Sequence, residues 1–385
     1  MKRLLALGGC LAALLALTIL PPCSPAMAAD PIKIGAVFSV TGPASFLGEP
    51  EKHTVEMLVK QINAADGVLG RPLEIIVYDD ETDVNKCVLA VDKLLKKDKV
   101  TAVVGPTTSG NTLAVKAKFD AAKIPLVSCA AAEKITTPVS PWVFKTPQTD
   151  RHAVERILQH AKAQGIKKIA ILTVSDGFGQ AGREVLLQLL PEKGFELVAD
   201  EAFGPKDTDM TAQLTAIKDK APDAIICWGT NPGPAVVARN RQQLGIAIPL
   251  YMSHGVASKK FIELSGDAAE GIYLPAGRLA VAAQIADTHP QKQVLTTYIA
   301  DYEAQYKMPV SSFGGYAYDG LMLIVEAIKM GNSAEPQAIR DNLEKISGFV
   351  GTGGIFTMTA EDHNGLTADA FEMVRIEQGD WKIVQ

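Results

Sequence analysis

The strongest constraint on the fold is an alternation of short apolar runs with amphipathic segments, which begins at Asp30. Apolar runs rich in β-branched residues are typical of strands that are buried on both faces. They occur at 32–38, 73–78, 100–104, 125–128 and 143–145. Between the second and third runs, apolar residues at helical spacing from Val84 to Leu95 predict a helix. This βαβ pattern predicts a parallel sheet that is covered by helices.

A second series of the same kind follows a helix that ends at Gly165. It predicts strands at 168–174, 195–199, 224–228 and 248–252, and helices at 182–190 (closed by Pro191), 295–306, 316–330 and 336–346, before a glycine-rich turn at 351–354. No long Pro- or Ser-rich linker separates the two series, as expected for a chain that crosses between lobes more than once. We therefore predict an α/β fold with two doubly wound parallel-sheet lobes joined by crossing segments.

The first 28 residues have the pattern of a secretory signal peptide. A basic pair at 2–3 precedes an apolar run at 4–20, and the small residues Ala26 and Ala28 follow. The apolar run contains glycines and ends at a proline pair, so it is a poor membrane span. We expect cleavage after Ala28, or one residue later, and a protein that is exported to the periplasm.

The charge balance and the cysteines exclude several classes of protein. Lys plus Arg is 38 and Asp plus Glu is 43, a net charge of −5 without a basic run, which argues against a nucleic-acid partner. After export three cysteines remain, Cys87, Cys129 and Cys227, and an odd number leaves at least one free thiol. There is no CxxC or HExxH motif, and the six histidines are scattered, so we predict no metal site.

A glycine motif at Gly177 to Gly182 raises the possibility of a dinucleotide enzyme. The six residues match GxGxxG between a predicted strand and a helix, and Asp200 lies near the position of a ribose-binding acid. Against this, Asp176 would put a negative charge beside the pyrophosphate, and the motif opens the second sheet rather than the first. We predict no cofactor and no enzyme activity, and keep an exported nucleotide-cofactor enzyme as the alternative.

Polar loops follow the predicted strands, which is where open parallel sheets bind ligands. They lie at 39–48, 105–111, 128–133, 175–179, 229–233 and 253–255. The second loop enters a helix, whose free N–H groups and positive dipole end can hold a carboxylate. Capping of that helix by Thr108 or Ser109 would equally explain its hydroxyl residues.

Six blocks resemble the branched-chain amino-acid type of periplasmic substrate-binding protein: "IKIGAVFSVTGPASFLGE", "VYDDETDVNKCVLAVDKLL", "VTAVVGPTTSGNT", "IPLVSCAAAEKIT", "KKIAILTVSDGFGQAG" and "AIICWGTNPGPAVVARNRQQLGI". The resemblance implies a type I binding protein that closes on a ligand and delivers it to an inner-membrane ABC permease. It also implies that the glycine motif is a chance match. We place the N-terminal lobe at 29–150 and 278–352 and the C-terminal lobe at 151–277 and 353–385, and expect a monomer.

The same resemblance implies where the ligand binds. Ser109 and Gly110 match the loop that holds the ligand carboxylate in amino-acid binders, and the backbone of Ala130 matches a further contact. Phe178 matches the aromatic residue that covers the ligand, without its phenolic oxygen. The carboxylate side of the site is therefore expected to be retained.

The ammonium side departs from the family pattern. Ala132 has no hydroxyl where amino-acid binders tend to have threonine, and Thr230 and Leu47 stand where tyrosines are common. His254 takes the place of the acid that neutralises the ammonium. If the contact with the ligand needs the protonated form of His254, the affinity for the ligand should fall as the pH rises from about 5.5 to 8.

These departures predict a ligand without an amine. An unpaired ammonium in a closed cleft costs several kcal/mol, against roughly 8 kcal/mol for a micromolar complex. We therefore expect a small apolar or aromatic carboxylate. A branched-chain amino-acid or amide binding protein remains an alternative, as does a ligand-sensing regulator on the same fold.

Overall fold

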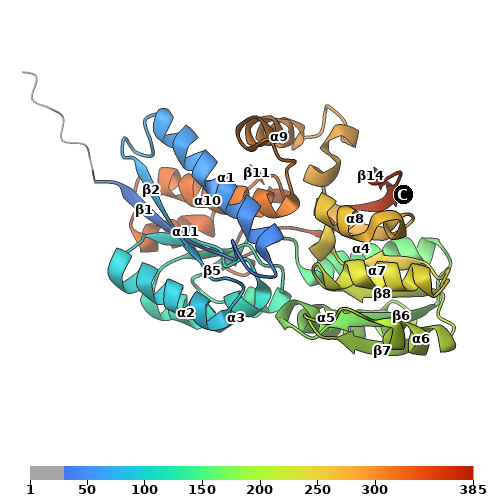
Figure 1. The fold of residues 1–385 in the computed structure, drawn as a ribbon. Coiled ribbons are helices and arrows are strands. Elements are labelled where there is room, and N and C mark those ends of the chain that lie inside the picture. Colours follow the sequence, from blue (N-terminus) through green and yellow to red (C-terminus); the bar gives the residue numbers. More distant parts are fainter. Residues whose placement is uncertain (1–29, 385) are drawn as a thin grey trace, which may run out of the picture.

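The computed structural model describes residues 30–384, so the predicted signal peptide lies outside the described residues. The chain forms two large sheets that lie side by side, each between layers of helices (Figure 1). A small antiparallel pair, β11 (Phe349–Val350) and β12 (Ile355–Phe356), frames the predicted glycine-rich turn. The prediction of an α/β fold with two sheets is confirmed.

The first sheet has five parallel strands in the order β2-β1-β3-β4-β5. They are β1 (Ile32–Phe38), β2 (Leu73–Asp79), β3 (Ala102–Val104), β4 (Leu126–Ser128) and β5 (Val143–Lys145). The strand order reverses between β1 and β3, and the loops at such a switch point diverge to opposite faces of the sheet. A crevice is therefore expected outside the carboxyl ends of these two strands.

Helices cover both faces of this sheet (Figure 1). Side chains of β1 alternate between two cores, with Ile34 and Phe38 on one face and Val37 on the other. The first core is completed by α1 (Ser45–Ala64), α10 (Ser312–Gly331) and α11 (Pro336–Leu343), and the second by α2 (Val84–Lys93) and α3 (Ser109–Ala122). A further helix, α9 (Lys292–Tyr306), packs on α1 through Tyr298 and Tyr302.

The second sheet has seven strands in the order β14-β13-β10-β9-β8-β6-β7. Five are parallel: β6 (Lys168–Val174), β7 (Glu196–Phe203), β8 (Ala224–Trp228), β9 (Leu250–Met252) and β10 (Tyr273–Gly277). Its faces are covered by α4 (Asp150–Ala163) and α5 (Gly177–Glu192) on one side, and by α6 (Thr211–Asp219), α7 (Gly233–Gln243) and α8 (Lys259–Ser265) on the other.

The second sheet departs from the parallel arrangement at one edge. There, β13 (Phe371–Glu377) runs antiparallel to β10, and β14 (Asp380–Ile383) returns antiparallel to β13. Gln378 and Gly379 connect the two strands, both with positive φ (53° and 71°). Two successive left-handed residues make the tight hairpin turn that matches the twist of antiparallel strands.

Several predicted boundaries also shift. Helix α5 begins at Gly177 rather than at residue 182, because Asp176 caps it, and it continues through Pro191 instead of ending before it. Strand β7 extends to Phe203, beyond the predicted end at residue 199. Helix α10 begins at Ser312, four residues earlier than predicted, where the Ser311 hydroxyl accepts from the Gly314 N–H.

Crossing segments between the two sheets are tied to one another by side chains. Gln148, in the segment after β5, donates to the Gly353 carbonyl (2.7 Å) and accepts from the Tyr316 hydroxyl (3.2 Å). Asp319 on α10 accepts from the N–H groups of Thr352 and Gly353. Burial raises the pKa of this carboxyl to about 7. The crossing segments thus share one buried hydrogen-bonded cluster.

The segment after β12 packs first on one sheet and then on the other. Phe356, Met358 and Leu366 pack in the core of the first sheet, whereas Phe371 packs in that of the second. These contacts favour a crossing near Ala370 rather than at residue 352, and the lobe boundaries remain a prediction.

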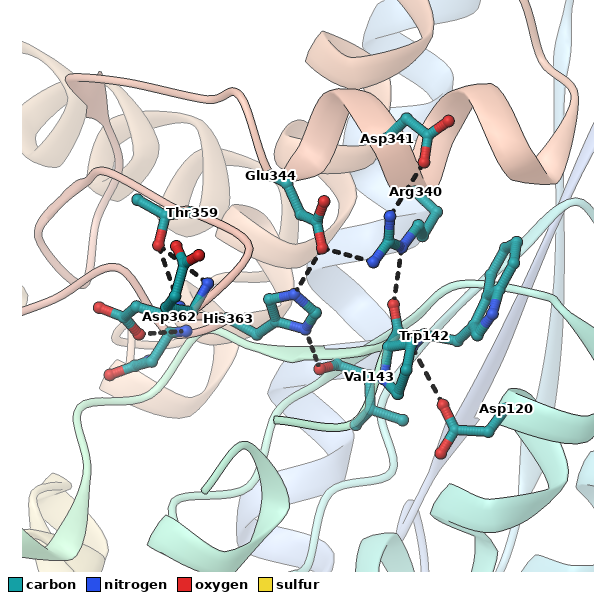
Figure 2. A network of polar contacts seen from close by, with 12 residues as sticks. Asp120, Trp142, Val143, Arg340, Asp341, Glu344, Thr359, Asp362 and His363 are labelled. Atoms are coloured by element: carbon teal, nitrogen blue, oxygen red, sulfur yellow. Dashed lines mark hydrogen bonds and ion pairs between the residues drawn. The ribbon is translucent and has the colours of Figure 1, made fainter. Parts of the chain in front are cut away.

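His363 fastens the loop before that crossing to the first sheet (Figure 2). Its ring stacks on Phe144, with the centroids 4.0 Å apart. Its Nδ1 lies 3.0 Å from the Val143 carbonyl oxygen and its Nε2 lies 3.0 Å from the Glu344 carboxylate, which also pairs with Arg340 at 2.6 Å. The loop therefore holds β5 and α11 together, next to the start of the first crossing.

The three cysteines of residues 30–384 are all buried and free. Burial raises the pKa of each thiol, which makes them poor nucleophiles. Over the same residues no helix is long and apolar enough to cross a membrane. No group of three or more His, Cys, Asp or Glu side chains in this part of the chain is placed to hold a metal ion.

Candidate functional site

A cavity of about 340 Å³ lies where the strand-end loops of the two sheets meet. Loops after β1, β3 and β4 line one side, and loops after β6, β8 and β9 line the other. Seven of the predicted site residues line it: Leu47, Ser109, Gly110, Ala130, Phe178, Thr230 and His254. The structure thus brings together residues that are more than 200 positions apart in the sequence.

Ala132 is the predicted site residue that does not line this cavity. It is fully buried in the core beneath α3, among Val115 and Ile135. Its backbone N–H donates to the Ser109 hydroxyl oxygen at 3.2 Å. Ala132 therefore contributes to the site only by orienting the Ser109 hydroxyl.

The start of α3 forms one wall of the cavity. Thr108 is the N-cap, and its hydroxyl accepts from the Asn111 N–H at 3.4 Å. Ser109 is the first helical residue, so its hydroxyl is not needed for capping. Because that oxygen accepts from Ala132, its proton remains free to donate into the cavity. The wall combines this hydroxyl with the positive end of a helix.

A buried polar network holds this wall from behind. The Thr107 hydroxyl accepts from the Ser39 N–H (2.9 Å) and donates to the Glu51 carboxyl group. Asp80 accepts from the Ser39 hydroxyl (2.6 Å) and from the Asn111 side chain (2.8 Å). Burial raises the pKa of Glu51 well above its ordinary value. The network fixes the loop before α3 without placing a charge in the cavity.

The start of α5 forms the facing wall and explains two glycines of the GxGxxG motif. A Cβ on Gly179 would lie 1.7 Å from the Val174 carbonyl oxygen, and one on Gly182 would lie 2.1 Å from the Trp228 indole nitrogen. Both glycines are therefore required for packing α5 against the sheet.

The acidic residues beside the motif do not serve a dinucleotide. The Asp176 carboxylate accepts from the N–H groups of Phe178 (3.0 Å) and Gly179 (2.9 Å), the donors that a pyrophosphate would need. Asp200 is paired with Arg183 and does not line the cavity. The arrangement favours helix capping and packing over nucleotide binding.

His254 lies in an aromatic enclosure on the same side of the cavity. Its ring centroid is 5.5 Å from that of Phe178, 5.8 Å from that of Trp228 and 5.4 Å from that of Phe371. The side chain is 2% exposed, and neither ring nitrogen has a hydrogen-bond partner among the described residues. Burial, aided by the nearby Lys145 and His152, lowers the pKa of His254 to about 3. The imidazole is therefore neutral near physiological pH. This argues against a ligand contact that requires the positively charged ring and is lost between pH 5.5 and 8.

Asn231 is a cavity residue that the sequence reasoning missed. It is 5% exposed, and both its amide oxygen and its amide nitrogen lack partners among the described residues. It lies in the predicted loop 229–233, and a polar residue after a buried strand was the available signal.

A buried lysine stabilises the loop between the two walls. Lys145 donates to the carbonyl oxygens of Ala131 (2.7 Å) and Pro147 (3.2 Å), both of which line the cavity. Burial lowers the pKa of Lys145 and raises that of its buried neighbour Asp150. The attraction between the two side chains opposes both pKa shifts. We therefore assign the pair a structural role and not that of a charge that binds ligand.

The sequence profile of the family described as periplasmic binding protein matches residues 31–380. The chain belongs to this family. A match over nearly all described residues fits the two sheets and the cavity between them. Its relatives are of the branched-chain amino-acid type, as the resemblance predicts.

Similar proteins are named as receptors for small molecules. A leucine-, isoleucine-, valine-, threonine- and alanine-binding protein of Pseudomonas aeruginosa is 26% identical over 334 residues, 86% of either chain. An extracellular ligand-binding receptor of Rhodopseudomonas palustris HaA2 has a TM-score of 0.87 and 27% identity, covering 92% of this chain and 99% of that one. LivJ of Streptococcus pneumoniae, solved with isoleucine, has a TM-score of 0.81 and 26% identity, with 92% and 99% covered.

Proposed function

We propose that this periplasmic binding protein takes up a small carboxylate without an amine, apolar or aromatic, in the cavity between its sheets. It acts as a monomer in the periplasm and passes the ligand to an ABC permease of the inner membrane. The observation that carries the ligand class is the neutral His254, without a hydrogen-bond partner in the described chain, at the place where amino-acid binders use an acid.

The carboxylate end of the site supports an anion. Ser109 and Gly110 line the cavity at the start of α3, and the first turn of that helix has no acidic side chain. Charge-assisted hydrogen bonds of this kind are short and strong.

The opposite end supports a ligand without an ammonium group. His254 is held neutral mainly by burial and further by the nearby Lys145, so it offers no charge to neutralise an amine. Phe178 and His254 instead present ring faces and edges to the cavity. An apolar or aromatic body fits this lining better than a cation does.

A branched-chain amino acid is the second candidate, because one observation favours it. Asp176 lines the cavity, and only its Oδ1 is used for capping α5. Its other oxygen could pair with the ammonium group of an amino acid. The names of the relatives are those of amino-acid-binding proteins. Asp176 is part-buried, so such a pair would be partly screened by water.

Matched ligands that differ in the amine alone separate the two candidates. Leucine and 4-methylpentanoate share a carbon skeleton, and benzoate and phenylacetate extend the series to aromatic acids. A ligand at 100 times its Kd raises stability by about 2.7 kcal/mol, which thermal denaturation detects readily. We expect 4-methylpentanoate or an aromatic acid to raise the Tm more than leucine does. Micromolar leucine binding by calorimetry, without a response to the acids, would establish the second candidate.

A further inference from the structure

Asn231 and His254 lie on neighbouring loops that are locked together. Asn231 follows β8 and His254 follows β9, and these two strands are adjacent in the second sheet. The Ser253 hydroxyl, directly before His254, donates to the Gly229 carbonyl oxygen at 2.9 Å. The two side chains are thus held on one wall of the cavity by the sheet itself.

Both side chains are buried yet have no hydrogen-bond partner in residues 30–384. The amide oxygen and nitrogen of Asn231 and both ring nitrogens of His254 are unpartnered, although both residues line the cavity. Buried polar groups in folded proteins are nearly always hydrogen-bonded, so four unpartnered atoms on one wall call for an explanation. A ligand that supplies the missing partners is the simplest one.

The chemistry of these atoms defines what the ligand must carry. A neutral imidazole offers one donor and one acceptor, and a carboxamide offers donors and acceptors. The nearby Lys145 acts on His254 and disfavours a cation beside it. Among the described lining residues, Asp176 is the single carboxylate, and it caps α5. The wall therefore suits an uncharged group that both donates and accepts.

We propose that Asn231 and His254 form a specificity subsite for a neutral polar group, a hydroxyl, carbonyl or primary amide, at the end of the ligand opposite its carboxylate. This inference rests on the proposed function, because it presupposes a carboxylate bound at the start of α3. It narrows the ligand to an acid that carries such a group on an apolar or aromatic body.

The test measures affinity by calorimetry for pairs of acids that differ in that group alone. The pairs are benzoate with 3-hydroxybenzoate, 4-hydroxybenzoate and 4-carbamoylbenzoate, and 4-methylpentanoate with 4-oxopentanoate. We expect at least one polar member to bind about tenfold more tightly than its apolar partner. The zwitterion 4-(aminomethyl)benzoate, which would place an ammonium group at this wall, should bind more weakly than benzoate.

Two variants assign the preference to the subsite. In Asn231→Leu and in His254→Phe the ratio of the affinity for the polar member to the affinity for its apolar partner should fall toward one. The Tm without ligand verifies that each variant is folded. A preference that persists in both variants, or a wild type without any preference, overturns the subsite. Absence of binding by every acid overturns the proposed function, and the subsite with it.

An isosteric substitution that adds a charge at Asn231 gives a second, independent test of the subsite. Asn231→Asp keeps the shape of the side chain and places a carboxylate on this wall. It should weaken binding of the preferred acid and strengthen that of 4-(aminomethyl)benzoate. Asn332→Asp, an exposed residue just after the end of α10 that does not line the cavity, makes the same change of net charge and should alter neither. Equal effects of the two variants would show that Asn231 does not face the ligand.

Discussion

Gly177, the first residue of α5, lies so close to Gly110 of α3 that a Cβ on it would be 2.9 Å from the Gly110 Cα. The neighbour is backbone, which cannot turn aside as a flexible side chain can. The starts of the two helices, which belong to different sheets, therefore touch beside the cavity. Glycine at residue 177, the first of the GxGxxG motif, permits this approach.

Gly177→Ala should consequently weaken ligand binding while leaving the fold intact. The added methyl has to separate the two helix starts, and overpacking of this kind costs about 1–3 kcal/mol. Gly177 does not have a positive φ, so alanine is compatible with its backbone and the Tm without ligand should not fall by a comparable amount. Calorimetry with the tightest acid of the panel measures the loss. Full affinity in this variant would show that binding does not require so close an approach.

Ser109→Ala should reduce carboxylate affinity by roughly 1.5–3 kcal/mol, because its hydroxyl donates to a charged group. Thr108 rather than Ser109 caps α3, so stability should change less than affinity. Thr108→Ala is the complementary variant, because it removes the cap of α3 but keeps Ser109. It should lower the free energy of unfolding by about 1 kcal/mol. Urea denaturation and calorimetry on both variants separate the roles. Unchanged affinity in Ser109→Ala would leave that hydroxyl with only its bond to Ala132.

Four of the strands that form apolar runs could be predicted to the residue. The predicted bounds of β1, β5, β6 and β8 agree with the structure. Burial on both faces makes most positions of such a strand apolar, so the run and the strand largely coincide. The hairpin of β13 and β14 was missed because it has one exposed edge, and its turn at Gln378 and Gly379 lacks the usual Asn-Gly signal.

The polar part of the site was harder to predict than its location. Loops after strands indicated the cavity, but Asn231 and Lys145 resemble ordinary surface residues in the sequence. Both are buried only because segments distant in the chain cover them. The role of Ala132 was likewise hidden, since its N–H orients Ser109 while its side chain packs in the core. A single sequence contains no record of such contacts.

His254 should make stability depend on pH. Its pKa is about 3 in the folded protein against an ordinary value of 6.5, so the folded state favours the neutral ring. The resulting stabilisation is complete above about pH 6.5 and is lost as the pH falls toward 3, by up to about 1.4 kcal/mol per pH unit. In His254→Phe the midpoint of urea denaturation should depend less on pH between pH 6.5 and 4 than it does in the wild type. The pKa of His152, about 4, leaves a residual slope in that variant. An identical pH dependence in both proteins would contradict a buried neutral His254.

Lys145→Met should destabilise the protein by about 3–5 kcal/mol, because it leaves the Asp150 carboxylate buried without its opposite charge. Both side chains are fully buried, and neither Asp150 oxygen has a hydrogen-bond partner in the described residues. Combining Lys145→Met with Asp150→Asn removes both charges and should recover much of that loss. Denaturation by urea at pH 7 gives the three free energies of unfolding. The double variant should still bind more weakly, since the Ala131 and Pro147 carbonyls that line the cavity lose their donor. Additive losses in the double variant would show that the two charges do not interact across the first crossing.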